Sequence, residues 1–143
     1  MYTKSNVAPS ALARQRILVV DDDEDTRELT GLILRAHGAE VTEAGSAADG
    51  LSLLQAQGFD ALVADIGLRG SDGYELIRAV RALPPTGGGQ VAAIAVTGYA
   101  SAKDRNQALA AGYDWHLSKP VDPASLVDVV SGVLLGRRMR ARD

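Results

Sequence analysis

Five short segments of strand character alternate with five segments of helical character along this chain of 143 residues. Each of the five apolar, strand-like segments has the length of a strand and falls far short of the roughly 18 apolar residues that a membrane span needs. Strands that are apolar on both faces occur in parallel sheets covered by helices on either side, so the alternation predicts an α/β fold. The expected strands occupy residues 16–20, 39–44, 59–65, 91–98 and 115–120.

The order of the strands follows from connection rules. Crossovers between parallel strands are right-handed, which leaves few topologies for five such units. We therefore expect a flavodoxin-like, doubly wound five-stranded parallel sheet of order 2-1-3-4-5 with five helices.

Capping residues mark several helix ends. Gly38 follows the first helical segment, Ser46 begins the second, and Asp122 can cap the last, with Pro123 at its first position. The glycine-rich stretch 84–90 is expected to form a flexible loop. The first helical segment carries apolar residues at helical spacing, namely Leu29, Leu32, Ile33 and Ala36.

Composition predicts one domain with two tails. We expect a flexible N-terminal tail over residues 1–14, a domain over 15–136, and a basic tail over 137–143. The net charge of −3 is too mild to indicate direct binding to nucleic acid, and no membrane span or signal peptide is visible. The absence of cysteine excludes disulfides and thiolate chemistry and favours a cytoplasmic location.

Five consecutive acidic residues follow the first strand, from Asp21 to Asp25. Two carboxylates about 5 Å apart repel by roughly 3 kcal/mol at an effective dielectric of about 20, so water, a helix N-terminus or a cation must offset the cost. Asp23, Glu24 and Asp25 are expected in the first turn of a helix, where negative charge is favourable. Asp21 and Asp22 are expected to bind a cation.

Other strands end at residues that complete such a site. Ligands of doubly wound sheets bind outside the carboxyl ends of the strands, where Asp21 and Asp22 should meet Asp65, Thr97 and Lys119. Carboxylates and phosphate oxygens are the ligands that Mg²⁺ prefers, and a hydroxyl and an ammonium can hold the other oxygens of a phosphoryl group. This set of side chains predicts phosphoryl-transfer chemistry with Mg²⁺ (or Mn²⁺) as the cofactor.

Two glycines lie beside these acids and hydroxyls. Gly67 follows the third strand and Gly98 follows the fourth. Because glycine has no side chain, the backbone N–H groups at both positions can approach a phosphoryl group closely.

Four motifs in order resemble the receiver domain of bacterial two-component response regulators: "ILVVDD", "LVADIGLRGSDGYEL", "AVTGYA" and "LSKPVD". The resemblance covers residues 16 to about 135 and is most similar to free-standing receivers and to those of hybrid histidine kinases. It implies that Asp65 accepts a phosphoryl group from the phosphohistidine of a histidine kinase or phosphotransfer protein.

The resemblance also implies roles for the surrounding residues. Asp22 matches the acid that binds Mg²⁺ directly, Asp21 the acid that acts chiefly through water, and Gly67 the residue whose backbone carbonyl binds the metal. Thr97 matches the switch hydroxyl that moves to the phosphoryl group, and Lys119 matches the lysine that pairs with that group.

Further positions depart from the family's commonest pattern or are less specific. His116 stands where the family has an aromatic residue that rotates with the switch, and Tyr99 could cover the phosphoryl group. Arg69 replaces a proline and Ser71 replaces a methionine in the loop after Asp65, which leaves the loop freer.

The resemblance therefore predicts a phosphorylation-dependent signalling switch that is not a turnover enzyme. Its downstream protein partner is expected on the face of the fourth helix, fifth strand and fifth helix. Two alternatives stay open: a receiver-like interaction module that works without phosphorylation, and an Mg²⁺ phosphatase with an aspartate nucleophile.

Overall fold

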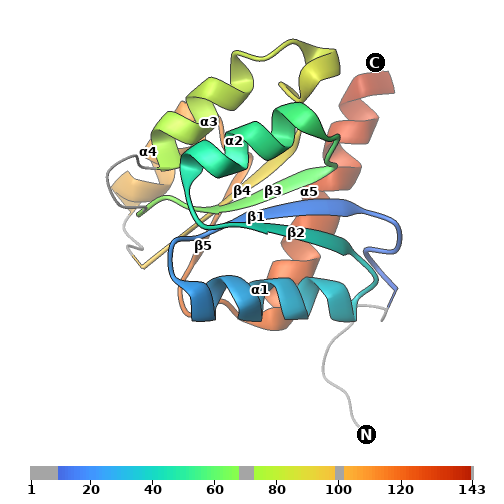
Figure 1. The fold of residues 1–143 in the computed structure, drawn as a ribbon, viewed down its shortest axis with the longest axis vertical. Helices are drawn as coiled ribbons and strands as arrows, with labels where there is room; N and C mark the ends of the chain where they lie inside the picture. The colour runs from blue at the N-terminus through green and yellow to red at the C-terminus, as the bar shows by residue number, and fades with distance from the viewer. Residues whose placement is uncertain (1–9, 68–72, 99–101, 143) are drawn as a thin grey trace, which may run out of the picture.

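The computed structural model describes residues 10–67, 73–98 and 102–142 of the chain (Figure 1). The strands are β1 (Arg16–Val20), β2 (Glu40–Ala44), β3 (Ala61–Asp65), β4 (Ala92–Thr97) and β5 (Trp115–Ser118). The helices are α1 (Glu24–Ala36), α2 (Ala47–Ala56), α3 (Gly73–Arg81), α4 (Ala102–Ala111) and α5 (Pro123–Arg142), with a 3₁₀ turn at Pro85–Gly87.

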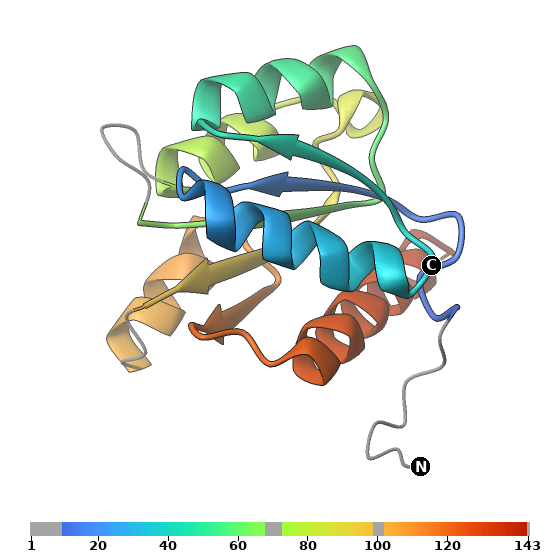
Figure 2. The same ribbon diagram turned by 60° about the horizontal axis from the view of Figure 1, so that its bottom comes forward.

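The five strands form one parallel sheet in the order β2-β1-β3-β4-β5, which confirms the predicted topology. Helices α1 and α5 cover one face of the sheet, whereas α2, α3 and α4 cover the other (Figures 1 and 2). All the strands run the same way, so their carboxyl ends lie along one edge.

The core consists of two layers, one on each face of the sheet. Leu18 and Val20 pack with residues of α2 and α3, while Ile17 and Val19 pack with residues of α1 and α5. Successive side chains of a strand point to opposite faces, so an apolar strand such as β1 supplies both layers at once. This double burial is the reason that the central strands contain so few polar residues.

Helix α1 is turned differently from what its apolar spacing suggests. Leu34 is buried, but Leu29 and Leu32 are 57% and 63% exposed. On the side of α1 that packs on β2, Gly31 lies so close to the strand that a Cβ there would be 3.0 Å from Glu43 Oε2. Close approach through Gly31 therefore brings α1 against the sheet with two leucines on its outer side.

The N-terminal boundary lies earlier in the chain than predicted. Leu12 is fully buried in the layer beneath α1 and α5, and its N–H donates to the carbonyl of His37 over 2.9 Å. Residues 10–14 thus belong to the folded domain, and the prediction of a flexible tail is wrong for them. One leucine in a polar stretch shows no periodicity, so the sequence pattern did not reveal the contact.

The prediction of a basic tail from residue 137 is also wrong, because α5 continues to Arg142. Arg137 forms a bidentate pair with Asp114, with Nη2 to Oδ1 at 2.8 Å and Nε to Oδ2 at 3.0 Å. Arg81 of α3 reaches the same carboxylate at 3.2 Å, and burial together with the charge of Arg137 lowers the pKa of Arg81. In the described ranges no helix has both the length and the hydropathy for a membrane span.

The predicted flexible loop at 84–90 is a hydrogen-bonded turn. The N–H groups of Gly87 and Gly89 both donate to the carbonyl of Pro84, at 2.8 and 3.1 Å. Gly88 has a φ of 105°, and a Cβ at that position would clash with Leu54 at 2.4 Å. The glycines therefore permit a compact turn against the end of α2.

Candidate functional site

Four strands deliver polar residues to the carboxyl edge of the sheet. Asp21 follows β1, Asp65 ends β3, Thr97 ends β4 and Lys119 follows β5 directly. The exposed fractions of Asp21, Asp65 and Thr97 are only 5%, 9% and 1%. Buried polar groups cost free energy unless they are paired, so the polar side chains gathered at this edge need partners.

Three carboxylates meet at this edge as predicted. Asp21, Asp22 and Asp65 each offer an oxygen, and these oxygens all lie within 4.8 Å of one another. The ammonium of Lys119 lies 3.0 Å from Asp65 Oδ2 and 3.3 Å from Asp21 Oδ2. Three ionised carboxylates and one ammonium leave a net charge of −2, which a divalent cation would balance.

Backbone groups orient the two buried carboxylates. The N–H of Asp23 donates to Asp21 Oδ1 and the N–H of Gly67 donates to Asp65 Oδ1, each over 2.9 Å. Lys119 contacts the other oxygen of both side chains. Each carboxylate oxygen accepts one of these bonds and has a second lone pair, so both side chains retain acceptor capacity for a metal or phosphoryl ligand.

The rest of the acidic run behaves as a helix N-terminus, as predicted. Asp23 is the N-cap of α1, and its Oδ2 accepts from the N–H of Thr26 at 3.2 Å. Glu24 and Asp25 lie in the first turn. The bonds from Thr26 lower the pKa of Asp23. The N-terminus of α1 therefore offsets the repulsion among the acidic residues in this part of the run.

Burial and neighbouring groups both shift the pKa values of Asp21 and Lys119. Burial raises the pKa of Asp21 above its usual value, and the charge of Asp65 adds to the rise despite the opposing bonds from Asp23 and Lys119. Burial also tends to lower the pKa of Lys119, but the carboxylates of Asp65 and Asp21 outweigh it and raise that pKa. Lys119 is therefore an ammonium at neutral pH, and the charge of Asp21 is costly to the fold.

This cost predicts that Asp21→Asn stabilises the metal-free protein. A carboxyl group whose pKa is higher in the folded state than its ordinary value of 3.8 disfavours folding once it is ionised in both states. We expect the free energy of unfolding to rise by about 0.5–2 kcal/mol at pH 7 in the presence of a chelator. The gain should shrink as the pH falls through the raised pKa of Asp21 and vanish below the unfolded value.

Urea titrations of both proteins at pH 7 and pH 3.5 measure the difference. Asp128→Asn, which changes an exposed carboxylate on α5, is the matched control. A variant that is less stable than the wild type at pH 7 would show that Asp21 does not carry this penalty.

The fourth and fifth strands place their polar residues together. The backbone N–H of Lys119 donates to the carbonyl of Thr97 over 2.7 Å, and a cis peptide joins Lys119 to Pro120. Gly98 follows Thr97 and is exposed at the same edge. Tyr99, the predicted cover of the site, lies outside the described residues, as do Arg69 and Ser71.

His116, the predicted partner of the switch hydroxyl, is buried in β5. It pairs with Ala95 in the sheet register and is only 8% exposed, whereas its neighbour Trp115 is 52% exposed. The alternation of a strand accounts for the contrast, since the two side chains point to opposite faces. Its role in a switch stays a prediction.

Arg27 is a residue of this site that the sequence analysis missed. Its Nη1 donates to the carbonyl oxygen of Asp21 over 2.8 Å, and its Nε lies 3.4 Å from Glu43 Oε1. A signal was available, because a cation near the start of a helix opposes the helix dipole and so requires another partner.

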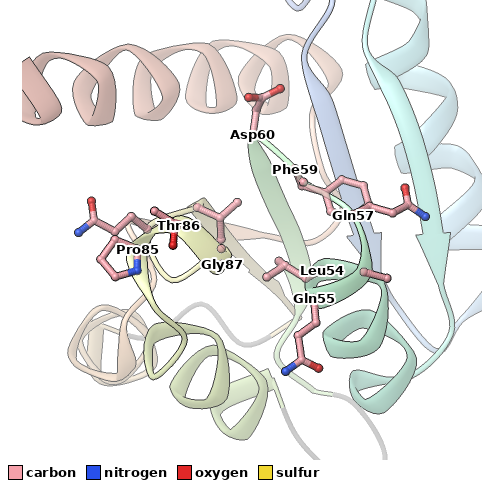
Figure 3. A pocket seen from close by; sticks show the side chains of 13 residues that line it. Leu54, Gln55, Gln57, Phe59, Asp60, Pro85, Thr86 and Gly87 are labelled. Carbon is pink, nitrogen blue, oxygen red and sulfur yellow. The ribbon is translucent and has the colours of Figure 1, made fainter.

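The hollow in Figure 3 is separate from this site. It has a volume of about 470 Å³ and lies between the end of α2 and the 3₁₀ turn, with Asp60 at its rim. Asp60 immediately precedes β3 and Asp65 ends it, so about 16 Å of strand separates the two. The hollow is therefore at the amino edge of the sheet.

The fold and the site together define a class of protein. This is a doubly wound parallel α/β domain whose carboxyl edge presents three carboxylates, a threonine and a lysine. The profile of the response regulator receiver domain matches residues 17–131. The chain belongs to that family.

One curated relative has nearly the same length. An uncharacterized 14.6 kDa protein of the sodA1 3′ region of Leptolyngbya boryana is 47% identical over 119 residues, which are 83% of this chain and 89% of the relative. Other curated relatives are longer, among them the response regulator protein PilR of Pseudomonas aeruginosa (30% identical) and the sensor protein GacS of Pseudomonas syringae (28% identical). The chain spans between 8% and 48% of seven such proteins.

Solved structures share the same fold. A CheY-like receiver domain protein from Methanospirillum hungatei is 34% identical with a TM-score of 0.80, over 90% of this chain and 99% of that one. The receiver domain of sensor histidine kinase PA1611 from Pseudomonas aeruginosa is 31% identical with a TM-score of 0.77, over 85% and 98% of the two chains. That structure is described with a magnesium ion coordinated in its active-site cleft.

Proposed function

We propose that the protein is a phosphorylation-dependent switch of a two-component phosphorelay and that Asp65 is its phosphoacceptor. The observation that carries this proposal is the meeting of Asp65 with two further carboxylates and the ammonium of Lys119 at 3.0 Å. The donor is the phosphohistidine of a histidine kinase or phosphotransfer protein, as for receiver domains generally. A cytoplasmic location agrees with this role and stays a prediction.

Mg²⁺ (or Mn²⁺) fits the residues at the acidic edge. Hard divalent cations take carboxylate oxygens and keep several waters, and the three acids here offer oxygens within 4.8 Å of one another. Asp22 and Asp65 would bind the ion directly, Asp21 chiefly through water, and Gly67 through its backbone carbonyl. When bound, the ion supplies positive charge that neutralises the acids and the phosphoryl oxygens.

The transfer itself is a substitution at phosphorus. A carboxylate oxygen of Asp65 forms a bond to phosphorus, the P–N bond of the phosphohistidine breaks, and the imidazole leaves with the electron pair and takes up a proton. Lys119 balances charge on the phosphoryl oxygens, and the N–H groups of Gly67 and Gly98 can donate to them. The gain is positioning and charge stabilisation, which dominate phosphoryl transfer.

The signal is read on the surface of α4, β5 and α5. After transfer, Thr97 would follow the phosphoryl group and His116 would adjust in β5, with Tyr99 modulating access. Trp115 on β5, Leu109 on α4 and Leu135 on α5 are 52%, 41% and 57% exposed, which supports this face as the site of a downstream protein partner. Exposed apolar side chains mark a protein-binding surface where they form a contiguous patch.

Labelling of the chain with a radioactive phosphodonor tests the proposal. We expect up to one phosphoryl group per chain when Mg²⁺ is present and none when a chelator removes it, because the acids repel an anionic donor without the cation. Capture of protein partners before and after labelling reports the switch.

The same experiment distinguishes the alternatives. Partner capture that is identical with and without labelling would favour an interaction module that works without phosphorylation. Sustained multiple-turnover hydrolysis of phosphate esters would favour an Mg²⁺ phosphatase.

A further inference from the structure

We propose that Arg27 is a positioning residue for the divalent-cation site: its guanidinium holds the peptide that joins Asp21 to Asp22, and Glu43 of β2 holds the guanidinium. This inference rests on the proposed function, since it concerns how the acids are aimed at a cation. Arg27 itself touches neither the cation nor the phosphoryl group in this proposal.

The contacts connect Glu43 of β2, through Arg27, to residues 21–23, which we call the acidic loop. Nη1 of Arg27 donates to the carbonyl oxygen of Asp21 over 2.8 Å, while Nε lies 3.4 Å from Glu43 Oε1. The side chains of Arg27 and Glu43 are only 18% and 21% exposed. A partly buried guanidinium that contacts two acceptors is held in one orientation, because its planar fork is rigid.

The carbonyl of Asp21 matters because of where it lies in the chain. The peptide group is planar, so the oxygen of Asp21 and the nitrogen of Asp22 turn together. The N–H of Asp21 is already held by the carbonyl of Ala44 at 3.1 Å, and its carboxylate by the N–H of Asp23 at 2.9 Å. Arg27 fixes the peptide group between Asp21 and Asp22, and this group sets the direction of the backbone at Asp22.

The fold makes room for these contacts with two glycines. A Cβ at Gly45 would lie 3.2 Å from Nη1 of Arg27, and a Cβ at Gly31 would lie 3.0 Å from Oε2 of Glu43. Side chains at these positions would press on the guanidinium and on the carboxylate that holds it. The close fit on both sides supports a set position for Arg27.

A second arginine provides a matched comparison. Arg35 contacts the other oxygen of the same carboxylate, with Nη1 3.2 Å from Glu43 Oε2, and donates to the carbonyl of Val41 over 3.1 Å. These two contacts join α1 to β2 and do not include Asp21. Arg27 and Arg35 thus share one ion-pair partner, but only Arg27 also bonds the acidic loop.

A positioning role and a purely electrostatic role of Arg27 predict opposite changes in Mg²⁺ affinity when Arg27 is replaced. If Arg27 acted only through its positive charge, its removal would make the site more negative and Mg²⁺ would bind more tightly. If it positions the Asp21–Asp22 peptide, its removal weakens Mg²⁺ binding, as loss of outer-shell partners weakens metal sites. Lys at this position keeps the charge but not the fork that reaches two acceptors at once.

Isothermal titration with Mg²⁺ alone tests the proposal on the full chain. We expect Arg27→Gln and Arg27→Lys to weaken Mg²⁺ binding about 10-fold each, the lower end for outer-shell substitutions. Arg35→Gln, which breaks a pair that is half exposed, should stay within about twofold of the wild type. Glu43→Gln should weaken binding less than Arg27→Gln, and the double variant should bind like Arg27→Gln.

Several outcomes would overturn the proposal. Unchanged or tighter Mg²⁺ binding by Arg27→Gln, or full retention by Arg27→Lys, would reject positioning while leaving the proposed function intact. Absence of Mg²⁺ binding by the wild type would reject both. Thermal unfolding in a chelator verifies that each variant is folded, and Glu43→Gln tests the connection through Arg27 if Arg27→Gln does not fold.

Discussion

Asp65→Asn is expected to reduce labelling by acetyl phosphate at least about 100-fold, because the amide lacks the nucleophilic carboxylate that forms the bond to phosphorus. The variant should remain folded. The carbonyl oxygen of asparagine can still accept the bond that Gly67 N–H makes to Oδ1 at 2.9 Å. Removing one of three clustered carboxylates also relieves repulsion at the edge of the sheet.

Asp60→Asn is the matched control for this experiment. Asp60 lies just before the opposite end of β3 and accepts the N–H of Arg16 at 2.8 Å, so the substitution acts near the start of β3 without touching the three clustered carboxylates. Labelling should equal that of the wild type. Full-rate labelling of Asp65→Asn would show that another residue is the acceptor.

Lys119→Met is expected to slow labelling by about 100-fold, which is the effect of removing a donor that stabilises developing charge in an enzyme active site. The same substitution should strengthen Mg²⁺ binding several-fold, because the acids then carry the full charge of three carboxylates with no ammonium beside them. Methionine keeps most of the apolar length of the lysine side chain, so lost packing contributes little.

Lys103→Met, which changes an exposed lysine of α4, is the control for net charge. It should leave both the labelling rate and Mg²⁺ affinity unchanged. The opposite directions of the two effects of Lys119→Met make the prediction specific. Weaker Mg²⁺ binding by Lys119→Met would mean that the lysine supports the carboxylates more than it competes for them.

The topology could be predicted because it depends on local patterns. Strands buried on both faces must be apolar along their buried length, as in residues 17–20 of β1, 61–64 of β3 and 92–96 of β4, and helices must cover them. The positions of Asp21, Asp65, Thr97 and Lys119 then follow from the rule that parallel strands end at one edge. Each of these residues was therefore predictable from its place after a strand.

Contacts that depend on how elements pack were not predictable in this way. The burial of Leu12, the exposure of Leu29 and Leu32, and the ion pair between Arg137 and Asp114 each join segments far apart in the chain or set the rotation of a helix. Hydrophobic periodicity describes one element at a time, so it contains no information about these partners.

The amino-acid sequence by itself determined the strand order, the edge at which the acids gather, and the positions of Asp65, Thr97 and Lys119 at that edge. Only the tertiary structure decided that Asp21 and Asp65 share one ammonium and that Arg27, held by Glu43 of β2, secures the peptide between Asp21 and Asp22. The reason is physical: alternation and strand ends are properties of consecutive residues. A hydrogen bond between a helix and a neighbouring loop depends on the distance and angle at which the packed elements meet.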